Sequence, residues 1–175
     1  MRAATPAPVD TMGCAVLPNP LSSPKTQRFQ TLIALMLSSQ TLDTVTAPTI
    51  WNLQRVLPHG LDLQDMLEID EQELDKLICK IGFHTKKAGY IKRVAVIFRD
   101  EFNGDIPDTV EGLCSLPGVG EKMAHLCMTA AWKRYFLGDL RFILGPSGLA
   151  LIHMFIGLRI YYDGFQIQVR LRRRG

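Results

Sequence analysis

Lys122 is the residue whose type and setting best suit a nucleophile. It follows the segment LPGVG (residues 116–120), whose glycines and proline favour a tight turn between two short helices. Lys122 is therefore expected in the first turn of a helix, where the helix dipole disfavours positive charge. That field and partial burial would lower the pKa of the amine and free its lone pair. A neutral lysine attacks carbon bonded to nitrogen or oxygen and forms a Schiff base. An ordinary surface lysine is the alternative.

The turn before Lys122 has the features of a phosphate-binding site. Gly118 and Gly120 leave no side chain in front of the backbone amides. Those amides, with the free N–H groups at the start of the following helix, can bind a phosphate oxygen. Such contacts position a protein on a nucleic-acid backbone without reading its bases. A turn that only packs two helices together fits the five residues equally well.

Helical patterns precede the turn along most of the chain. Apolar residues recur at helical spacing from Phe29 to Leu37, and the polar stretch SSQT ends that pattern. Further helix starts are predicted at Asp43 or Thr46, Asp62, Asp70, Thr85 and Asp108. Little period-two alternation occurs before residue 160, and one alternating run, FQIQVRLR, follows it. The pattern predicts an all-α array of short helices.

Composition divides the chain into three segments. Residues 1–26 are rich in Pro, Ala and Ser and are expected to form an irregular leader. Residues 27–136 are expected to form the helical domain, and residues 137–175 an apolar and basic tail. The net charge of +3 comes from the two ends of the chain, because residues 29–136 carry more acidic than basic side chains. Total charge is therefore weak evidence for a nucleic-acid partner.

The cysteines and the apolar part of the tail argue against two kinds of site. Cys14, Cys79, Cys114 and Cys127 lack the short spacing of a zinc site or an iron–sulfur run, so no metal site is predicted. Free thiols in a reducing, intracellular setting are expected. The uncharged stretch 142–158 is just too short for a membrane span, and no membrane partner is expected.

Several stretches together resemble one family of DNA repair enzymes. The stretches are LMLSSQT (35–41), KLICKIGFHTKKAGYIK (76–92) and GDIPDTVEGLCSLPGVGEKMAHL (104–126). In sequence and spacing they are similar to the endonuclease III family, and most similar to its eukaryotic branch. These proteins are DNA glycosylases and AP lyases of the helix–hairpin–helix superfamily. The resemblance spans about residues 7–132 and implies a helix–hairpin–helix DNA glycosylase fold.

The resemblance implies roles for the residues around the turn. Lys122 would attack C1′ of an oxidised pyrimidine nucleotide that is flipped out of the duplex. The base leaves, an imine links protein and DNA, and β-elimination cuts the strand on the 3′ side. Gln40 would enter the gap in the duplex and pair with the orphaned base. His125 would line the base pocket, with a packed histidine as the equally weighted alternative. The hairpin would contact DNA through Leu116, Gly118, Val119 and Gly120.

Four basic residues on the long predicted helix are further candidates for phosphate contacts. They are Lys86, Lys87, Lys92 and Arg93. Charge clustered on a helix is more often simply a solvated face, and that interpretation is favoured.

Two features of the family are absent from the sequence. The family carries a VDTH-like motif whose aspartate assists the lysine, whereas the matching region here reads GDLRFILG. Asp139 is the one nearby carboxylate that could substitute for it in stabilising charge near the sugar. The family's four-cysteine motif for a 4Fe-4S cluster is also absent. No cofactor is therefore expected, and the fold is predicted to be incomplete, without the iron–sulfur domain. A truncated or mis-spliced gene product would explain the divergent tail.

Together these features predict a base excision repair enzyme, a bifunctional N-glycosylase and AP lyase. Its expected partner is double-stranded DNA containing oxidised pyrimidines or abasic sites, and it is expected to act as a monomer in the nucleus or mitochondrion. The missing aspartate predicts impaired turnover, with cleavage at pre-formed abasic sites as the residual activity. One alternative is a non-catalytic helix–hairpin–helix DNA-binding fragment. Another is a non-functional splice product, membrane-associated or poorly folded, that is dominated by its tail.

Overall fold

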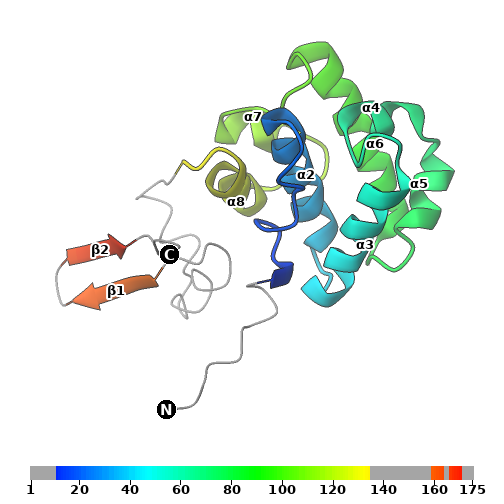
Figure 1. Cartoon of the computed structure of the whole chain (residues 1–175). Coiled ribbons are helices and arrows are strands. Elements are labelled where there is room, and N and C mark those ends of the chain that lie inside the picture. The colour runs from blue at the N-terminus through cyan, green and yellow to red at the C-terminus, as the bar shows by residue number, and fades with distance from the viewer. Residues whose placement is uncertain (1–10, 135–158, 164–165, 171–175) are drawn as a thin grey trace.

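The computed structural model describes residues 11–134, together with the backbone of residues 159–163 and 166–170. Residues 11–134 form helices joined by short loops (Figure 1). This arrangement confirms the predicted all-α helix–hairpin–helix fold for that part of the chain. The helices are α2 (Pro24–Ser38), α3 (Asp43–Val56), α4 (Leu63–Glu68), α5 (Glu71–Leu77), α6 (His84–Glu101), α7 (Val110–Cys114) and α8 (Glu121–Ala131).

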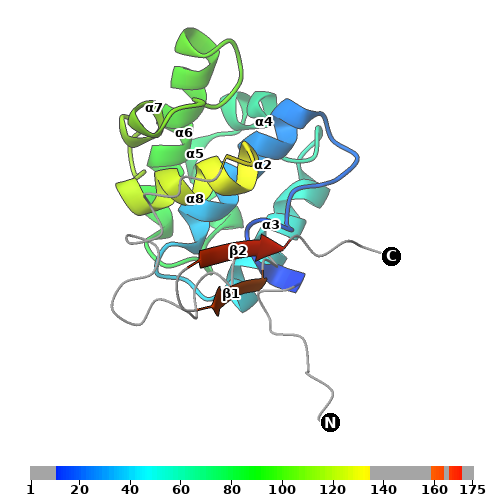
Figure 2. The same ribbon diagram turned by 90° about the vertical axis from the view of Figure 1, so that its left-hand side faces the viewer.

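Helix α2 lies at the centre of the hydrophobic core. All its residues from Phe29 to Leu37 are buried, as expected for a helix that other helices surround. It packs against α3, α6 and α8, and Figure 1 shows α8 on one side of it and α3 and α6 on the other. Figure 2, turned by 90°, shows α8 crossing over α2. The ring of Phe29 meets that of Phe98 on α6 edge to face, with centroids 6.2 Å apart. Helix α2 therefore sets the relative positions of α6 and α8.

Side-chain caps explain where several helices begin. Asp62 caps α4 and Asp70 caps α5, as predicted; the Asp70 carboxylate accepts a hydrogen bond from the backbone amide of Gln72 at 2.9 Å. Ser23 caps α2 by accepting a hydrogen bond from the amide of Thr26 at 3.2 Å. Helix α2 consequently begins at Pro24, before the boundary at residue 27 that composition suggested.

Three helix starts differ from the predicted ones. Helix α3 begins at Asp43, after Leu42, so neither Asp43 nor Thr46 acts as its cap. Helix α6 begins at His84 instead of Thr85. Helix α7 is capped by the hydroxyl of Thr109, which accepts from the amide of Gly112 at 3.1 Å, and not by Asp108. The Asp108 carboxylate is engaged elsewhere, because it lies 3.2 Å from the guanidinium of Arg134.

The segment before α2 contributes to the core. Cys14 and Leu17 are buried, and the carbonyl of Leu17 accepts a hydrogen bond from the Gln54 amide at 2.9 Å. Asn19 donates its backbone amide to the Gln30 side chain at 2.7 Å. From residue 14 onwards, the segment expected to be an irregular leader is therefore part of the helical domain.

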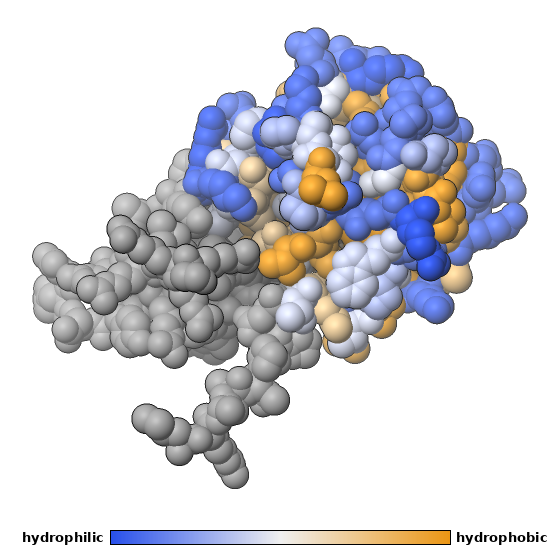
Figure 3. Space-filling model, viewed as in Figure 1, coloured by the Kyte–Doolittle hydropathy of each residue, from blue (hydrophilic) through white to orange (hydrophobic). Residues whose placement is uncertain are grey.

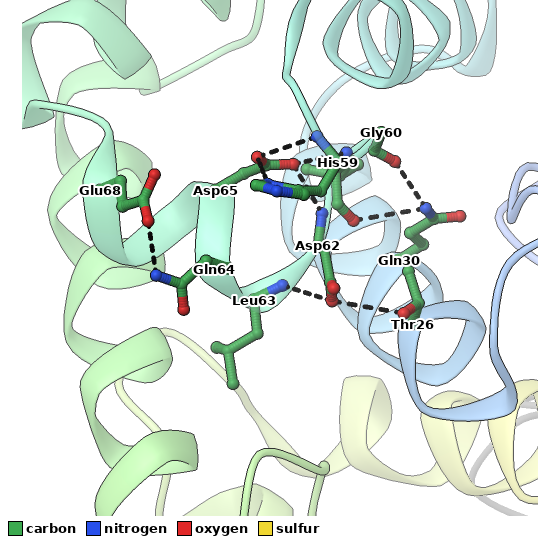
Figure 4. A network of polar contacts seen from close by, with 10 residues as sticks. Thr26, Gln30, His59, Gly60, Asp62, Leu63, Gln64, Asp65 and Glu68 are labelled. Atoms are coloured by element: carbon green, nitrogen blue, oxygen red, sulfur yellow. Dashed lines mark hydrogen bonds and ion pairs between the residues drawn. The ribbon is translucent and has the colours of Figure 1, made fainter.

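A buried carboxylate closes the loop between α3 and α4 (Figure 4). The side chain of Asp65 is fully buried and accepts hydrogen bonds from the backbone amides of Leu61 and Asp62, both at 3.1 Å, and of His59 at 3.2 Å. Nδ1 of the His59 ring lies 2.9 Å from the same carboxylate. Gln30 of α2 donates to a carbonyl of the loop at 2.8 Å. The loop's polar groups are thus bound by the protein itself.

Beyond residue 134, the described backbone forms a two-stranded antiparallel hairpin. Strand β1 (Arg159–Asp163) pairs with β2 (Gln166–Arg170), with Arg159 opposite Arg170. Strand β2 falls within the alternating run FQIQVRLR. The apolar stretch 142–158 lies outside the described residues. Among the helices that are described, none is both long and apolar enough to cross a membrane.

Large exposed apolar side chains are scattered over the described surface. Figure 3 shows hydrophobic patches separated by hydrophilic surface on one face of the molecule. The large apolar residues with exposed side chains in the described part of the chain are Val16, Leu21, Leu42, Trp51, Val56, Phe83 and Val96. Within this set, Phe83 alone has a left-handed backbone conformation, with φ of 58°. An exposed aromatic residue with such a backbone is unusual and marks its surroundings as a candidate site.

Candidate nucleic-acid interface

The loop between α7 and α8 is a hairpin anchored in the core. The amide of Val119 donates to the carbonyl of Leu116 at 3.2 Å, which closes the turn. The side chains of Leu116 and Val119 are buried, so they anchor the turn and are not available to a ligand. Gly118 has φ of 83°, and a Cβ atom there would lie 2.6 Å from the Tyr90 ring of α6. Glycine is therefore required at 118 by backbone conformation and by space.

Gly120 is not explained by packing. Its φ of −101° is ordinary for any residue, and an added Cβ would meet no atom of the described residues within 4 Å. It makes no side-chain cap for α8, whose first hydrogen bond runs from the amide of Ala124 to the carbonyl of Gly120 at 2.9 Å. The amides of residues 121–123 consequently have no intrahelical partner. Open amides behind a residue without a side chain are suited to binding an anion.

The amine of Lys122 extends from this helix start. The side chain is exposed, and within residues 11–134 no hydrogen bond or ion pair involves it. The partial burial that the sequence predicted for the amine is therefore not observed. The backbone amide of Lys122 is one of the open amides of α8, so an anion bound there would lie close to the residue that carries the amine.

A groove of about 290 Å³ lies next to the hairpin. It contains the sequence-predicted residues Gln40 and Gly118, which are far apart in sequence. Gln40 is exposed and has a left-handed backbone with φ of 52°. The described residues that line the groove are Met36, Ser39, Gln40, Phe83, Lys86, Lys87, Tyr90 and Gly118.

Phe83 is a candidate residue that the sequence analysis missed. Its side chain is 62% exposed although it is fully apolar, and it lines the same groove as Gln40. An apolar side chain held in solvent costs free energy unless a ligand covers it. The signal was available in the sequence, because an aromatic residue follows Gly82 in the short loop before the long helix.

The basic residues of α6 differ in whether the protein itself binds their side chains. The Lys92 amine is held by the carbonyls of Met66, Leu67 and Ile69 at 2.5–3.1 Å, at the end of α4. The Lys87 amine is also held by backbone carbonyls. Both amines are held by the protein, so the favoured interpretation of a solvated face is wrong for Lys87 and Lys92, and neither is free for the alternative, a phosphate contact. Lys86 is exposed and lines the groove.

Arg93 is exposed as well, and it interacts with Tyr90. Its guanidinium lies 5.0 Å from the centroid of the Tyr90 ring, which is the ring that Gly118 packs against. Lys86 and Arg93 therefore remain as possible phosphate contacts on α6.

Two other sequence candidates lie outside the groove. His125 is partly exposed on α8, one turn after Lys122, and is not among the residues that line the groove. Asp139 lies outside the described residues, so the structure gives it no position.

The described cysteines do not suit an iron–sulfur cluster. Cluster ligands are thiolates gathered around the iron atoms, whereas burial raises the pKa of Cys14 to about 11 and that of Cys127 to about 12. Cys79 and Cys114 are exposed free thiols. Within the described ranges, no group of three His, Cys, Asp or Glu side chains is arranged to hold a metal ion.

The chain is similar to known DNA repair proteins. Residues 33–161 match the model of the HhH-GPD superfamily of base excision DNA repair proteins, so the match extends past Trp132, where the sequence motifs ended. The endonuclease III homolog of Schizosaccharomyces pombe is 54% identical over 77% of this chain. The endonuclease III-like protein 1 of Bos taurus is 46% identical over 75% of it. The chain spans only 38% and 42% of the lengths of these two relatives.

The fold is also similar to that of solved structures. A trapped endonuclease III–DNA covalent intermediate, an estranged-adenine complex, matches with a TM-score of 0.57 at 29% identity. That match covers 61% of this chain and 48% of the other.

Proposed function

The chain belongs to the HhH-GPD superfamily of base excision DNA repair proteins, and we propose that it acts at damaged sites in double-stranded DNA with Lys122 as its nucleophile. The proposed activity is that of a bifunctional N-glycosylase and AP lyase on oxidised pyrimidines and abasic sites. The proposed setting is a monomer in the nucleus or mitochondrion, the compartments that hold such DNA.

The observation that carries the proposal is the shared position of the open amides and the amine. The amides of residues 121–123 can bind a backbone phosphate, and the side chain of Lys122 starts from the same turn of α8. A phosphate held by these amides brings the adjoining sugar within reach of a flexible exposed amine. Positioning of this kind replaces a bimolecular encounter with a local one.

The groove beside the hairpin supports the same orientation of DNA. Gly118 belongs to both the hairpin and the groove, so a duplex bound at the hairpin passes Gln40 and Phe83. We propose that Phe83 inserts between bases, because aromatic and apolar side chains can wedge a base step open. The Gln40 amide would then pair with the base left without a partner. Lys86 would contact a phosphate at the edge of the groove.

At an abasic site, formation of the imine needs only the amine. The open form of the sugar is an aldehyde, and the Lys122 nitrogen attacks its C1′ carbon and forms an imine with loss of water. Water then takes the C2′ proton, and the bond from C3′ to the phosphate oxygen breaks, so that the phosphate leaves with the electron pair of that bond and the strand is cut on the 3′ side. The electron pair of the broken C–H bond forms the new double bond, and the imine withdraws charge from C2′.

Removal of a base makes a larger demand, because positive charge develops on the sugar as the base leaves. A carboxylate near the sugar would stabilise that charge. Lys122 has no carboxylate partner within residues 11–134, and Asp139 is our proposed substitute. We therefore propose that the lyase step is the stronger of the two activities. We also propose that this chain works without an iron–sulfur cluster.

Borohydride trapping tests the proposal. Duplexes that carry either an abasic site or thymine glycol are incubated with the protein, and borohydride reduces any imine to a stable adduct. We expect an adduct with both duplexes, stronger with the abasic one, and none with Lys122→Ala. The matched control is Lys133→Ala, which removes another exposed lysine just after α8 and should leave trapping unchanged. Trapping that persists in Lys122→Ala would contradict the proposal.

A further inference from the structure

The two exposed left-handed residues of the groove stand on turns that are in direct contact. The amide of Gly82 donates to the hydroxyl of Thr41 at 3.2 Å, which joins the turn before Phe83 to the turn that contains Gln40. A Cβ atom on Gly82 would lie 3.1 Å from the carbonyl oxygen of Gln40. Gln40 and Phe83 therefore lie on two turns that are hydrogen-bonded to each other, although 43 positions separate them in sequence.

Lys87 forms hydrogen bonds with both turns, through its amine with one and through its backbone amide with the other. Its amine donates to the carbonyl oxygens of Leu37 at 2.8 Å and Ser39 at 2.6 Å. The Ser39 carbonyl belongs to the peptide group that leads into Gln40. The backbone amide of Lys87 donates to the carbonyl of Phe83 at 3.1 Å, which is the first hydrogen bond of α6. The amine thus ties the turn of Gln40 to the first turn of α6, which starts at Phe83 and is held there by an ordinary backbone bond.

The Lys87 amine is buried and has no carboxylate among its hydrogen-bond partners in the described residues, which is unusual for a lysine. The residue is 6% exposed, and burial lowers the pKa of its amine because the charged form loses water. Its hydrogen-bond partners are the neutral carbonyls of Leu37 and Ser39. They lie at the C-terminal end of α2, which has no basic residue in its own last turn. The amine therefore replaces a cap at that end and complements the helix dipole there.

We propose that Lys87 is a positioning residue that holds Gln40 and Phe83 in a fixed arrangement for insertion into the duplex. The inference rests on the proposed function, in which these two side chains enter the base stack. Left-handed conformations of non-glycine residues persist only where surrounding contacts over-determine them. A pair of side chains that is already arranged loses less entropy on binding than two mobile ones.

Lys92 supplies a matched control. It lies on the same helix, and its amine also donates to backbone carbonyls at the C-terminal end of a helix, in this case α4. Replacing either lysine with methionine keeps an unbranched side chain that is one atom shorter and removes the donors. Both variants should lose thermal stability, but only Lys87→Met should loosen the turns of the groove.

The experiment measures how well each variant recognises a lesion. A fluorescent 2-aminopurine is placed opposite a tetrahydrofuran abasic analogue, and affinity is compared with that for an undamaged duplex. We expect Lys87→Met to lose about tenfold of its preference for the lesion and most of the fluorescence change. Lys92→Met should keep the wild-type preference although its Tm is also lower. If a methionine variant does not fold, Lys87→Gln and Lys92→Gln give the same comparison with one donor retained.

The outcomes separate the two proposals. If the wild-type chain recognises the lesion, and variants of Lys87 and Lys92 keep the same preference, the positioning role is wrong while the proposed function stands. If the wild-type chain does not distinguish the lesion from undamaged DNA, the proposed function fails, and the inference fails with it.

Discussion

The loop before α4 and the hairpin before α8 differ in what binds the first backbone amides of the helix that follows. In both, a turn leads into a helix whose first amides have no intrahelical partner. Before α4, the Asp62 carboxylate accepts the amide of Leu63, the first residue of the helix, at 2.7 Å, and the buried Asp65 carboxylate accepts the amide of Asp62 itself at 3.1 Å. Before α8, Gly120 supplies no cap, and the space beside it is open. The protein itself binds an amide at the start of α4, whereas the amides at the start of α8 are available to an external anion.

This difference indicates where the molecule is built for stability and where for binding. A negative charge near a helix N-terminus is favourable, so a cap at position 120 would be easy to provide. Its omission fits a site in which a DNA phosphate takes the place that the Asp62 carboxylate has at α4.

The largest expected effect is on folding, from a change within the hairpin. Gly118→Ala forces a Cβ atom to within 2.6 Å of the Tyr90 ring at a residue with φ of 83°. We expect a loss of about 3 kcal/mol in the free energy of unfolding, measured by chemical denaturation. Gly120→Ala is the matched control and should cost no more than about 1 kcal/mol, because alanine is a poorer N-cap than glycine but no described atom opposes the added methyl group. Equal losses in the two variants would contradict the account of the hairpin.

The next effect concerns the turn that the protein satisfies itself. In Asp65→Asn, an amide group replaces a carboxylate oxygen and cannot accept from all the donors that surround it. We expect the free energy of unfolding to fall by about 2 kcal/mol. Affinity for an abasic duplex, measured on folded protein, should stay the same, since this loop is not part of the groove. A selective loss of DNA binding without a loss of stability would show that the two turns have been assigned the wrong roles.

A third change gives the hairpin the kind of cap that α4 has. Gly120→Asp places a carboxylate where it can accept the open amides of α8, and the backbone there suits a cap residue. We expect stability to rise by about 0.5 kcal/mol and affinity for an abasic duplex to fall about tenfold, because the carboxylate occupies the amides and repels phosphate.

Gly120→Asn separates charge from capping. It offers a neutral cap, so it should also stabilise the chain but weaken DNA binding less than the aspartate does. DNA binding that is unchanged in Gly120→Asp would rule out these amides as the phosphate site.

The smallest effect is a pH dependence of the α4 turn. The hydrogen bond to Asp65, followed by the carboxylate's charge, raises the pKa of His59 above its usual 6.5. Because the folded pKa is the higher one, the pair contributes stability that is complete below pH 6.5 and is lost as the pH rises through the folded pKa. Denaturation at pH 5.5 and pH 8.5 should show this decrease in the wild-type chain. His59→Gln should lack it, and an identical decrease in that variant would assign the pH dependence to other groups.

Features set by local sequence were predictable. The caps at Asp62 and Asp70 depend on residues a few positions away, and the apolar pattern of α2 reflects burial on every side. The glycines of the hairpin were recognised as a turn for the same reason. These signals are local, so a single sequence carries them.

Features set by distant contacts were not predictable. The hydrogen bond from Lys87 to Leu37 joins residues 50 positions apart, and in the sequence Lys87 looks like any other basic residue of a helix. Asp108 was expected to cap α7, but it pairs with Arg134, which lies 26 positions later in the sequence, after the hairpin and α8. For Lys122 the sequence left a partly buried amine and a surface lysine both open, because the position of a residue in a helix does not determine how much of it the surrounding helices cover.

Identification of the residue that reacts with DNA tests the central claim most directly. The borohydride-reduced adduct with an abasic duplex is digested, and the modified peptide is sequenced by mass spectrometry. The account predicts a single site at Lys122, with no modification of Lys86 although that lysine lines the groove. Modification at Lys86 or Lys133, or spread over several lysines, would contradict it, because the amides of α8 would then not be directing the sugar to one amine.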